Sequence, residues 1–371
     1  MTEDAKRLGF GLDATYAALD SELFVDGRQY GFPCNVNVVG FWANVETFRK
    51  VGMNPPPRTW DFATFEKIGK EFIRRANPPG KRQTVFFCNS ASGWQAERWL
   101  TVMHRSLGLS IFNETLTRCT LDDERYARVL ATIYKWTYED HILPSAADEA
   151  SFSSESGYGG SMLSLFQHGT YGMITIGRWC LIRIREFKHK PRLSVSAFPF
   201  EDFPNAVIGT RAAAVYAGSP NRDKAVLFLA FLASADYNQN IVREADALPP
   251  SPKYTNSEEY LRPPQYPNEW GCHEVPVEFS QTIAIGFSRS PFLSSGTVSR
   301  LLRQGLDKVM ANLATPRQAA RETAKRINAE IQRTIRENSC LARRYRKYIA
   351  LQEKIDQIRG TGKKVPMQWI K

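Results

Sequence analysis

The chain has 371 residues, of which 43% are hydrophobic and 12% aromatic, so a disordered chain is excluded and two lobes or domains are favoured. The formal net charge is +11, and residues 341–371 alone contribute +7, from nine Lys or Arg against Glu353 and Asp356. A basic tail on a nearly balanced body argues against a nucleic-acid-binding protein.

The sequence pattern also argues against a membrane helix, a signal peptide and a metal site. The longest apolar run, residues 225–233, is about half of the roughly 18 residues that suggest a membrane helix. The first thirty residues carry six acids and no apolar core, so we expect no signal peptide in them. The six cysteines are widely and irregularly spaced and form no CxxC pair, which predicts no metal and no cofactor.

Strands and helices are predicted to alternate along the chain. Short runs rich in β-branched and aromatic residues predict strands at 29–32, 38–42, 84–88, 172–176, 193–198 and 207–216. Apolar residues at three- to four-residue spacing predict helices at 62–73, 125–138 and 223–234. After about residue 297 the pattern is almost wholly helical. Mixed strands and helices with a helical end indicate an α/β protein.

A run of three prolines precedes the first of these helices. Pro55, Pro56 and Pro57 each fix φ and lack an N–H, so no helix runs through them. Thr59 is then the predicted N-cap. Asp61 would lie in the first turn, where a negative charge favours the helix dipole.

Residues 26–72, DGRQYGFPCNVNVVGFWANVETFRKVGMNPPPRTWDFATFEKIGKEF, resemble the signature region of the bacterial family 1 extracellular solute-binding proteins, the sugar-capturing components of ABC importers. Later segments follow in the order of that family. They are LFQHGTYGMITIGRWC (165–180), VSAFPF (195–200), VIGTRAAAVYAGSPNRDKAVLFLAFLAS (207–234) and LATPRQAARETAKRINAEI (313–331). The resemblance thus extends over roughly residues 26–335.

The resemblance implies a periplasmic binding protein-like type II fold, with two lobes around a cleft and a helical C-terminal end. Family members have further residues before the strand at 29–32, so the N-terminal lobe is expected to be incomplete. The implied domains are a remnant of the N-terminal lobe (1–39), a first part of the C-terminal lobe (40–192), a return to the N-terminal lobe (193–243), a helical part of the C-terminal lobe (244–340) and a basic helical tail (341–371).

A set of ligand-contacting residues also follows from the resemblance, because sugar recognition uses flat aromatic faces and fixed polar groups. Trp179 falls on the family's stacking tryptophan, and Asn37 on its acidic position at the lobe crossover. The other expected contacts are Asn35, Trp94, Arg178, Thr210, Arg211 and Phe292. Each residue type also has an ordinary structural role: tryptophan in a core, asparagine in a turn, arginine on an exposed surface.

The implied function is non-catalytic binding of a carbohydrate, a mono- or oligosaccharide, and its delivery to the permease subunits of an ABC transporter. The sequence contains no nucleophile elbow, P-loop or HExxH motif, so we do not expect an enzyme. A periplasmic or cell-surface location is implied by the family. Two alternatives stay open. One is a truncated solute-binding-like module that binds no ligand and acts as an interaction partner; the other is a glycan-cleaving enzyme, which needs two carboxylates flanking the sugar.

Residues 341–371 combine a loose amphipathic stripe with many basic residues. The simplest interpretation is a solvated terminal helix packed on the last lobe. The alternative is docking to an anionic membrane surface or to the permease. We therefore expect no nucleic-acid partner, and contact with the membrane only through the permease or through this tail.

Overall fold

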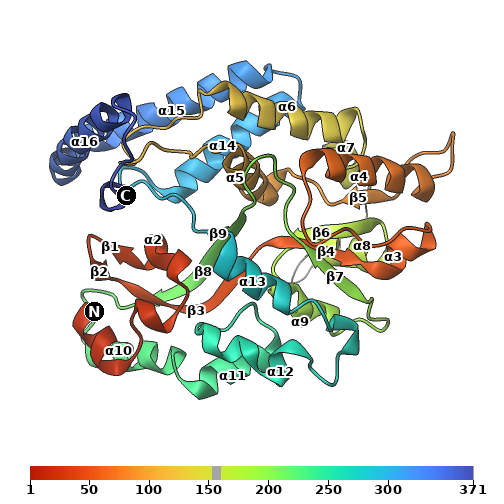
Figure 1. Cartoon of the computed structure of the whole chain (residues 1–371), viewed down its shortest axis with the longest axis horizontal. Helices are drawn as coiled ribbons and strands as arrows, with labels where there is room; N and C mark the ends of the chain where they lie inside the picture. Colours follow the sequence, from red (N-terminus) through yellow and green to blue (C-terminus); the bar gives the residue numbers. More distant parts are fainter. Residues whose placement is uncertain (153–159, 371) are drawn as a thin grey trace. The chain divides into compact units, whose positions relative to one another are not determined.

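The computed structural model describes residues 1–152 and 160–370 of the chain (Figure 1). The chain divides into two compact units. The first unit comprises Met1–Ser90 and Trp136–Phe287, and the second comprises Ala91–Lys135 and Ser288–Lys371. Each unit therefore brings together segments that are far apart in the sequence.

The first unit contains two principal sheets. In one, β3 (Gly31–Val38) pairs antiparallel with β8 (Ala206–Ala214), and β8 pairs in parallel with β9 (Ala284–Ile285). The other has the order β5-β6-β4-β7 and consists of β4 (Gly40–Asn44), β5 (Phe86–Cys88), β6 (Tyr171–Ile176) and β7 (Leu193–Ser196). A short antiparallel pair, β1 (Phe24–Val25) and β2 (Arg28–Gln29), lies apart from both. Because Val39 alone separates β3 from β4, one extended segment runs through both principal sheets.

Helices surround these sheets and make up most of the second unit. The first unit holds α1 (Thr2–Leu8), α2 (Asp20–Leu23), α3 (Val45–Lys50), α4 (Phe62–Ala76), α7 (Ala146–Ser151), α8 (Gly160–His168), α9 (Leu181–Ile184), α10 (Arg222–Leu232), α11 (Ala235–Glu244), α12 (Glu258–Leu261) and α13 (Glu274–Thr282). The second unit holds α5 (Ala96–Ser106), most of α6 (Glu124–Tyr138), α14 (Ser295–Met310), α15 (Pro316–Glu337) and α16 (Ser339–Gly360). No helix within residues 1–152 and 160–370 is long and apolar enough to cross a membrane.

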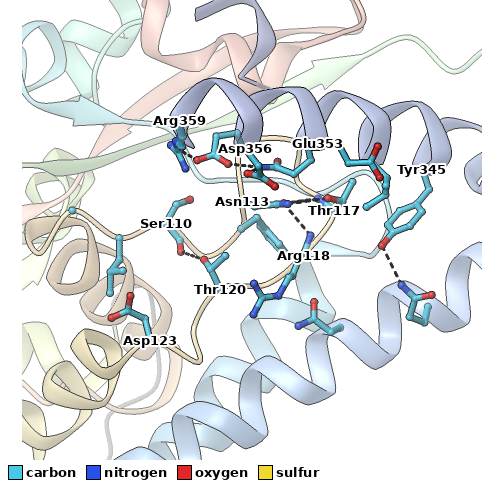
Figure 2. Close-up of a pocket in the computed structure, with 18 of the residues that line it drawn as sticks. Ser110, Asn113, Thr117, Arg118, Thr120, Asp123, Tyr345, Glu353, Asp356 and Arg359 are labelled. Carbon is cyan, nitrogen blue, oxygen red and sulfur yellow. Dashed lines mark hydrogen bonds and ion pairs between the residues drawn. The ribbon is translucent and has the colours of Figure 1, made fainter. Parts of the chain in front are cut away.

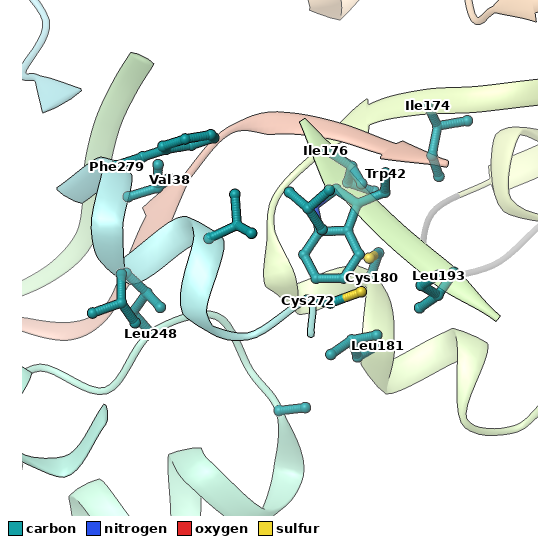
Figure 3. Close-up of a cluster of buried hydrophobic side chains, with 14 of the residues drawn as sticks. Val38, Trp42, Ile174, Ile176, Cys180, Leu181, Leu193, Leu248, Cys272 and Phe279 are labelled. Carbon is teal, nitrogen blue, oxygen red and sulfur yellow. The ribbon is translucent and has the colours of Figure 1, made fainter. Parts of the chain in front are cut away.

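A hydrophobic cluster joins the elements of the first unit (Figure 3). Trp42 of β4 is fully buried in it, as are Cys180 and Cys272. The cluster draws side chains from both principal sheets, including Val38 of β3 and Ile174 of β6. Burying apolar surface stabilises a fold by roughly 25 cal/mol per Å², so this cluster anchors the segment after β6, on which the predicted Trp179 lies.

The structure confirms the helix after the three prolines but corrects its N-cap. The side chain of Asp61, not Thr59, accepts a hydrogen bond from the backbone N–H of Thr64, at 2.7 Å. Asp61 is still extended and forms a bridge with Phe200. The helix begins at Phe62, where the apolar pattern predicted it, and its N-cap lies two residues later than predicted.

Two of the predicted domain boundaries cut across packed structure. Leu193–Ser196 pairs with β4, so residue 193 still belongs to the four-stranded sheet. The chain returns to the β3–β8 sheet at Ala206. Residues 244–287 lie in the first unit, where Leu248 bridges Val36 of β3, and not with the C-terminal helices. The assignment of these segments to two lobes stays a prediction.

In the second unit, α14, α15 and α16 follow one another along the chain, and each packs against the next (Figure 1, blue). Gln352 of α16 is buried, and its Oε1 accepts hydrogen bonds from the N–H and the hydroxyl of Thr115, at 3.2 and 2.9 Å. Ile355 is fully buried. The basic tail is therefore packed onto the rest of its unit, as its simplest interpretation predicted.

Candidate functional site

Two of the predicted site residues meet across the β3–β8 ladder, where Asn35 lies opposite Arg211. Both donate hydrogen bonds to one carboxylate oxygen, Oδ2 of Asp246: Arg211 Nη2 at 2.7 Å and Asn35 Nδ2 at 2.9 Å. Asn35 is itself buried. Asp246 was not predicted from the sequence, and it joins the two residues that were.

The turn that carries Asp246 has an unusual backbone. Its two neighbours, Ala245 and Ala247, have φ of 57° and 65°, in the left-handed region that non-glycine residues seldom adopt. Such conformations cost on the order of 1–3 kcal/mol each and persist where the surroundings enforce them. Here Arg178 contributes the restraint, because its Nη1 donates to the Ala247 carbonyl at 2.7 Å.

Arg178 therefore has a different role from the predicted ligand contact. Its side chain is 1% exposed and lies 4.5 Å above the ring of Tyr260. Nη2 donates to the Val242 carbonyl at 3.3 Å, and Nε donates to Nδ1 of His273 at 3.1 Å. Burial lowers the pKa of this guanidinium. Each of the three nitrogens donates a hydrogen bond within the protein and the side chain is buried, so Arg178 supports the Asp246 turn from behind.

Asn37 and the segment leading to Trp179 are packed together. Asn37 Oδ1 is buried, and no partner for it occurs among the described residues. A Cβ at Gly177 would lie 1.6 Å from this oxygen, so only glycine leaves room for Asn37 there. Trp179 is half-buried and packs against the cluster of Figure 3. The structure thus brings Asn37 and the backbone of the Trp179 turn into contact.

Thr210, another predicted contact, has its hydrogen-bonding groups engaged. Its hydroxyl donates to the Asn35 carbonyl at 2.6 Å, and its backbone N–H donates to Glu22 Oε2 at 3.0 Å. Thr210 therefore holds the strand that presents Asn35.

A small pocket of about 320 Å³ opens beside this cluster. It is lined by Ile182, Arg183, Glu186, Arg211 and Asp246. Its volume is at the lower end of the range for small-molecule sites. Carboxylates accept and guanidinium groups donate hydrogen bonds, so the Arg211–Asp246 pair can bridge two neighbouring hydroxyls of one ligand. This pocket is the candidate site.

Sequence reasoning missed three of the polar groups that line this pocket. Arg183 and Glu186 follow Trp179 within a few residues and form an ion pair with each other; their nearness to Trp179 was the available signal. Asp246 carries no local signal at all, because its neighbours in the site are Asn35 and Arg211, which are remote in sequence.

The other two predicted contacts belong to the second unit. Trp94 is 54% exposed, and the Arg98 guanidinium lies 4.9 Å from its ring centroid, so its indole is accessible. Phe292 is fully buried and packs edge-on against Tyr345 and Tyr348 of α16, with ring centroids 5.1 and 5.8 Å apart. The predicted role of Phe292 is therefore corrected to that of a core residue of its unit.

The second unit has a larger pocket, of about 860 Å³ (Figure 2). Its walls are α15, α16 and the loop that follows α5. From α16 it is lined by Tyr345, Ile349, Gln352, Glu353, Asp356 and Arg359. Its arginines are paired: Arg125 with Asp123 at 2.8 Å, Arg118 with Asp122 at 2.8 Å, and Arg359 with Glu114. Among its described lining residues, none belongs to the predicted ligand-binding set.

The tertiary structure resembles solved solute-binding proteins of ABC transporters. The protein from Thermotoga lettingae TMO bound with alpha-D-tagatose has a TM-score of 0.71 and 16% identity, covering 89% of this chain and 79% of that one. The ABC substrate-binding protein from Listeria monocytogenes in complex with cycloalternan has a TM-score of 0.67 and 18% identity, covering 86% and 76%. UgpB from Mycobacterium tuberculosis in complex with glycerophosphocholine has a TM-score of 0.70 and 14% identity, covering 90% and 78%. The likeness shows the type II periplasmic binding fold.

The sequence matches the family model described as "Bacterial extracellular solute-binding protein" over residues 4–268. This match spans more than half of the chain, so the chain belongs to the bacterial extracellular solute-binding proteins. A comparison with curated proteins found no match. The predicted resemblance and the predicted fold class are both confirmed.

Proposed function

We propose that this protein binds a carbohydrate without chemically changing it and delivers it to an ABC transporter permease, in the periplasm or at the cell surface. The observation that carries the proposal is the family match over residues 4–268. Two of the similar structures hold a carbohydrate, tagatose and cycloalternan. The ligand would contact the pocket beside Asp246 and Arg211, with the indole of Trp179 supplying an apolar face.

The chemistry of the pocket supports a hydroxyl-rich ligand. A sugar ring presents neighbouring hydroxyls that both donate and accept, and Asp246 and Arg211 offer one acceptor and one donor group 2.7 Å apart. The volume of about 320 Å³ is suited to one sugar unit, free or at the end of a longer saccharide.

The test is thermal unfolding of the purified chain against a panel of mono- and oligosaccharides, with glycerophosphocholine as a non-sugar arm. A ligand at one hundred times its Kd adds about 2.7 kcal/mol to the free energy of unfolding, which raises the Tm by a few degrees. We expect one sugar class to raise the Tm and Trp179→Ala to abolish the shift.

Trp94→Ala is a second variant for the same thermal-unfolding panel, because Trp94 is the other accessible tryptophan of the predicted set. A rise with glycerophosphocholine and with no sugar would replace the carbohydrate by a phosphodiester ligand. A Tm that responds to no member of the panel would favour a module that binds no small ligand. Conversion of an added oligosaccharide to products would contradict non-catalytic binding.

A further inference from the structure

The solvent-facing side of α16 carries a stripe of cations. Arg343, Arg346, Lys347 and Lys354 are all exposed. At 3.6 residues per turn they fall within a sector of about 100° around the helix axis. Positive charge is thus gathered along one side of this helix.

The opposite side of α16 fixes the orientation of this stripe. Tyr345 and Asp356 line the large pocket of the second unit (Figure 2). Gln352 bonds to Thr115, and Ile355 is fully buried. Because these contacts hold the helix from one side, it cannot rotate its cations toward the protein.

The charges of the stripe are not neutralised locally. Within the described residues, none of the ion pairs involves Arg343, Arg346, Lys347 or Lys354. Of the two acids of α16, Asp356 lies on the pocket side, and Glu353 lines the pocket but lies at the edge of the stripe, about 20° around the axis from Arg346. Four cations against one flanking acid leave the stripe with a net positive charge toward solvent.

Just beyond α16, exposed apolar side chains follow further cations along the chain. Lys363 and Lys364 are exposed, and the segment after them exposes Met367 and Ile370. Cations beside exposed apolar side chains are typical of surfaces that rest in a membrane interface, where the charges meet lipid headgroups and the apolar groups reach the acyl boundary. A nucleic-acid surface would have no use for the apolar component.

We propose that this cationic face of α16, together with Met367 and Ile370, docks on a membrane surface rich in anionic phospholipid. The cationic face is formed by Arg343, Arg346, Lys347 and Lys354 of α16, and Lys363 and Lys364 extend it just beyond the helix. Attraction of each cation to an anionic leaflet strengthens binding about fivefold, and the apolar side chains add a component that salt does not screen. The docking would hold the protein at the membrane whether or not its solute is bound.

The experiment is co-sedimentation of the full chain with vesicles of equimolar phosphatidylglycerol and phosphatidylcholine, and with vesicles of pure phosphatidylcholine. We expect binding to the mixed vesicles alone, weakening as salt is added. Changing Arg343, Arg346, Lys347 and Lys354 to Gln together should lower the binding constant by at least a hundredfold. Among the residues that the structure describes, these side chains have no ion-pair partner, so the Tm of that variant should equal that of the unchanged chain.

A matched control removes an equal number of positive charges, four, from the first unit. It changes four exposed lysines to Gln: Lys50, Lys67, Lys81 and Lys224. If the control loses as much vesicle binding as the α16 variant, net charge alone is responsible and the proposal fails. Equal binding to pure phosphatidylcholine, or binding to single-stranded DNA with none to mixed vesicles, would also overturn it. Met367→Ser with Ile370→Ser should remove the part of the binding that persists at high salt.

Discussion

At the scale of single residues, Asp246 connects Asn35 and Arg211 in the candidate site, because both donate hydrogen bonds to its carboxylate. Asp246→Asn replaces an anionic acceptor with a neutral amide and should weaken sugar binding about 10- to 100-fold, since hydrogen bonds to charged groups contribute about 1.5–3 kcal/mol. Isothermal titration with the sugar that raises the Tm measures this loss.

The chain offers a closely matched control for that substitution. Asp4 pairs with Arg222 at 2.6 Å and is 21% exposed, as is Asp246. Asp4→Asn should leave sugar binding unchanged, and both variants should lose little stability because exposed ion pairs contribute about 0–1 kcal/mol. Equal affinity of Asp246→Asn and the unchanged chain would exclude Asp246 from the site.

Gly177 is the second residue whose substitution has a specific expected effect on stability. In Gly177→Ala the new Cβ would lie 1.6 Å from Asn37 Oδ1, so Asn37 must move. Overpacking of this kind typically costs about 1–3 kcal/mol, and we expect that loss of stability together with weaker ligand binding. Urea unfolding provides the measurement.

A double variant and a control glycine separate this local clash from a general effect of glycine replacement. Asn37→Ala in the Gly177→Ala background should restore most of the stability, because the clashing oxygen is gone. Gly296→Ala, where no atom lies within 4 Å of the added Cβ, should cost nothing. A loss that persists in the double variant would mean that Asn37 is not the cause.

At the scale of elements, the buried amide of Gln352 contributes to the anchoring of α16. Gln352 accepts from Thr115 and donates to Glu114 and Asp356, at 2.8 and 3.0 Å. Gln352→Leu leaves the buried Thr115 N–H without its partner and should cost about 1–3 kcal/mol, whereas the Thr115 hydroxyl keeps its hydrogen bond with the Thr117 hydroxyl at 3.0 Å. Chemical unfolding of the full chain tests this.

The exposed Gln357 of the same helix provides the comparison. Gln357→Leu should change the free energy of unfolding by at most about 0.5 kcal/mol, as surface substitutions usually do. If the two variants unfold alike, the hydrogen bonds of Gln352 do not anchor α16.

The elements themselves were largely predictable, because hydrophobic periodicity is a local signal. The predicted helix at 125–138 is α6, at Glu124–Tyr138, and the predicted strand at 172–176 is β6, at Tyr171–Ile176. The N-cap at Thr59 was wrong because Asp61 is held extended by its bridge to Phe200, a residue remote in sequence. Ends of elements depend on such neighbours, whereas their interiors depend on the local pattern.

At the scale of the whole molecule, each unit contains a buried histidine that is neutral when folded. Burial lowers the pKa of His104 in the second unit to about 3 and that of His273 in the first unit to about 4. Unfolding restores the ordinary value of about 6.5, so below that value the unfolded chain binds more protons than the folded one. The contribution of these two histidines to the free energy of unfolding is therefore fully present above about pH 6.5. It falls as the pH drops toward 4, by at most about 1.4 kcal/mol per pH unit for each histidine.

Urea unfolding at a series of pH values between 7 and 4 checks this prediction. His104→Phe keeps a ring beside Tyr126, 6.2 Å away, and should make the dependence on pH less steep. His168→Phe alters an exposed histidine and should leave the dependence as it was. An unchanged slope in His104→Phe would contradict a neutral buried His104.

The sequence by itself determined the family, the fold class and most helices and strands, because short motifs in a fixed order and hydrophobic periodicity are written along the chain. It also indicated Asn35, Asn37, Trp179 and Arg211. The tertiary structure alone decided that Asp246 joins Asn35 to Arg211, that Arg178 is buried behind that turn, and which face of α16 meets solvent. These features arise from contacts between segments tens to hundreds of residues apart, and such contacts leave no periodic signal in the sequence.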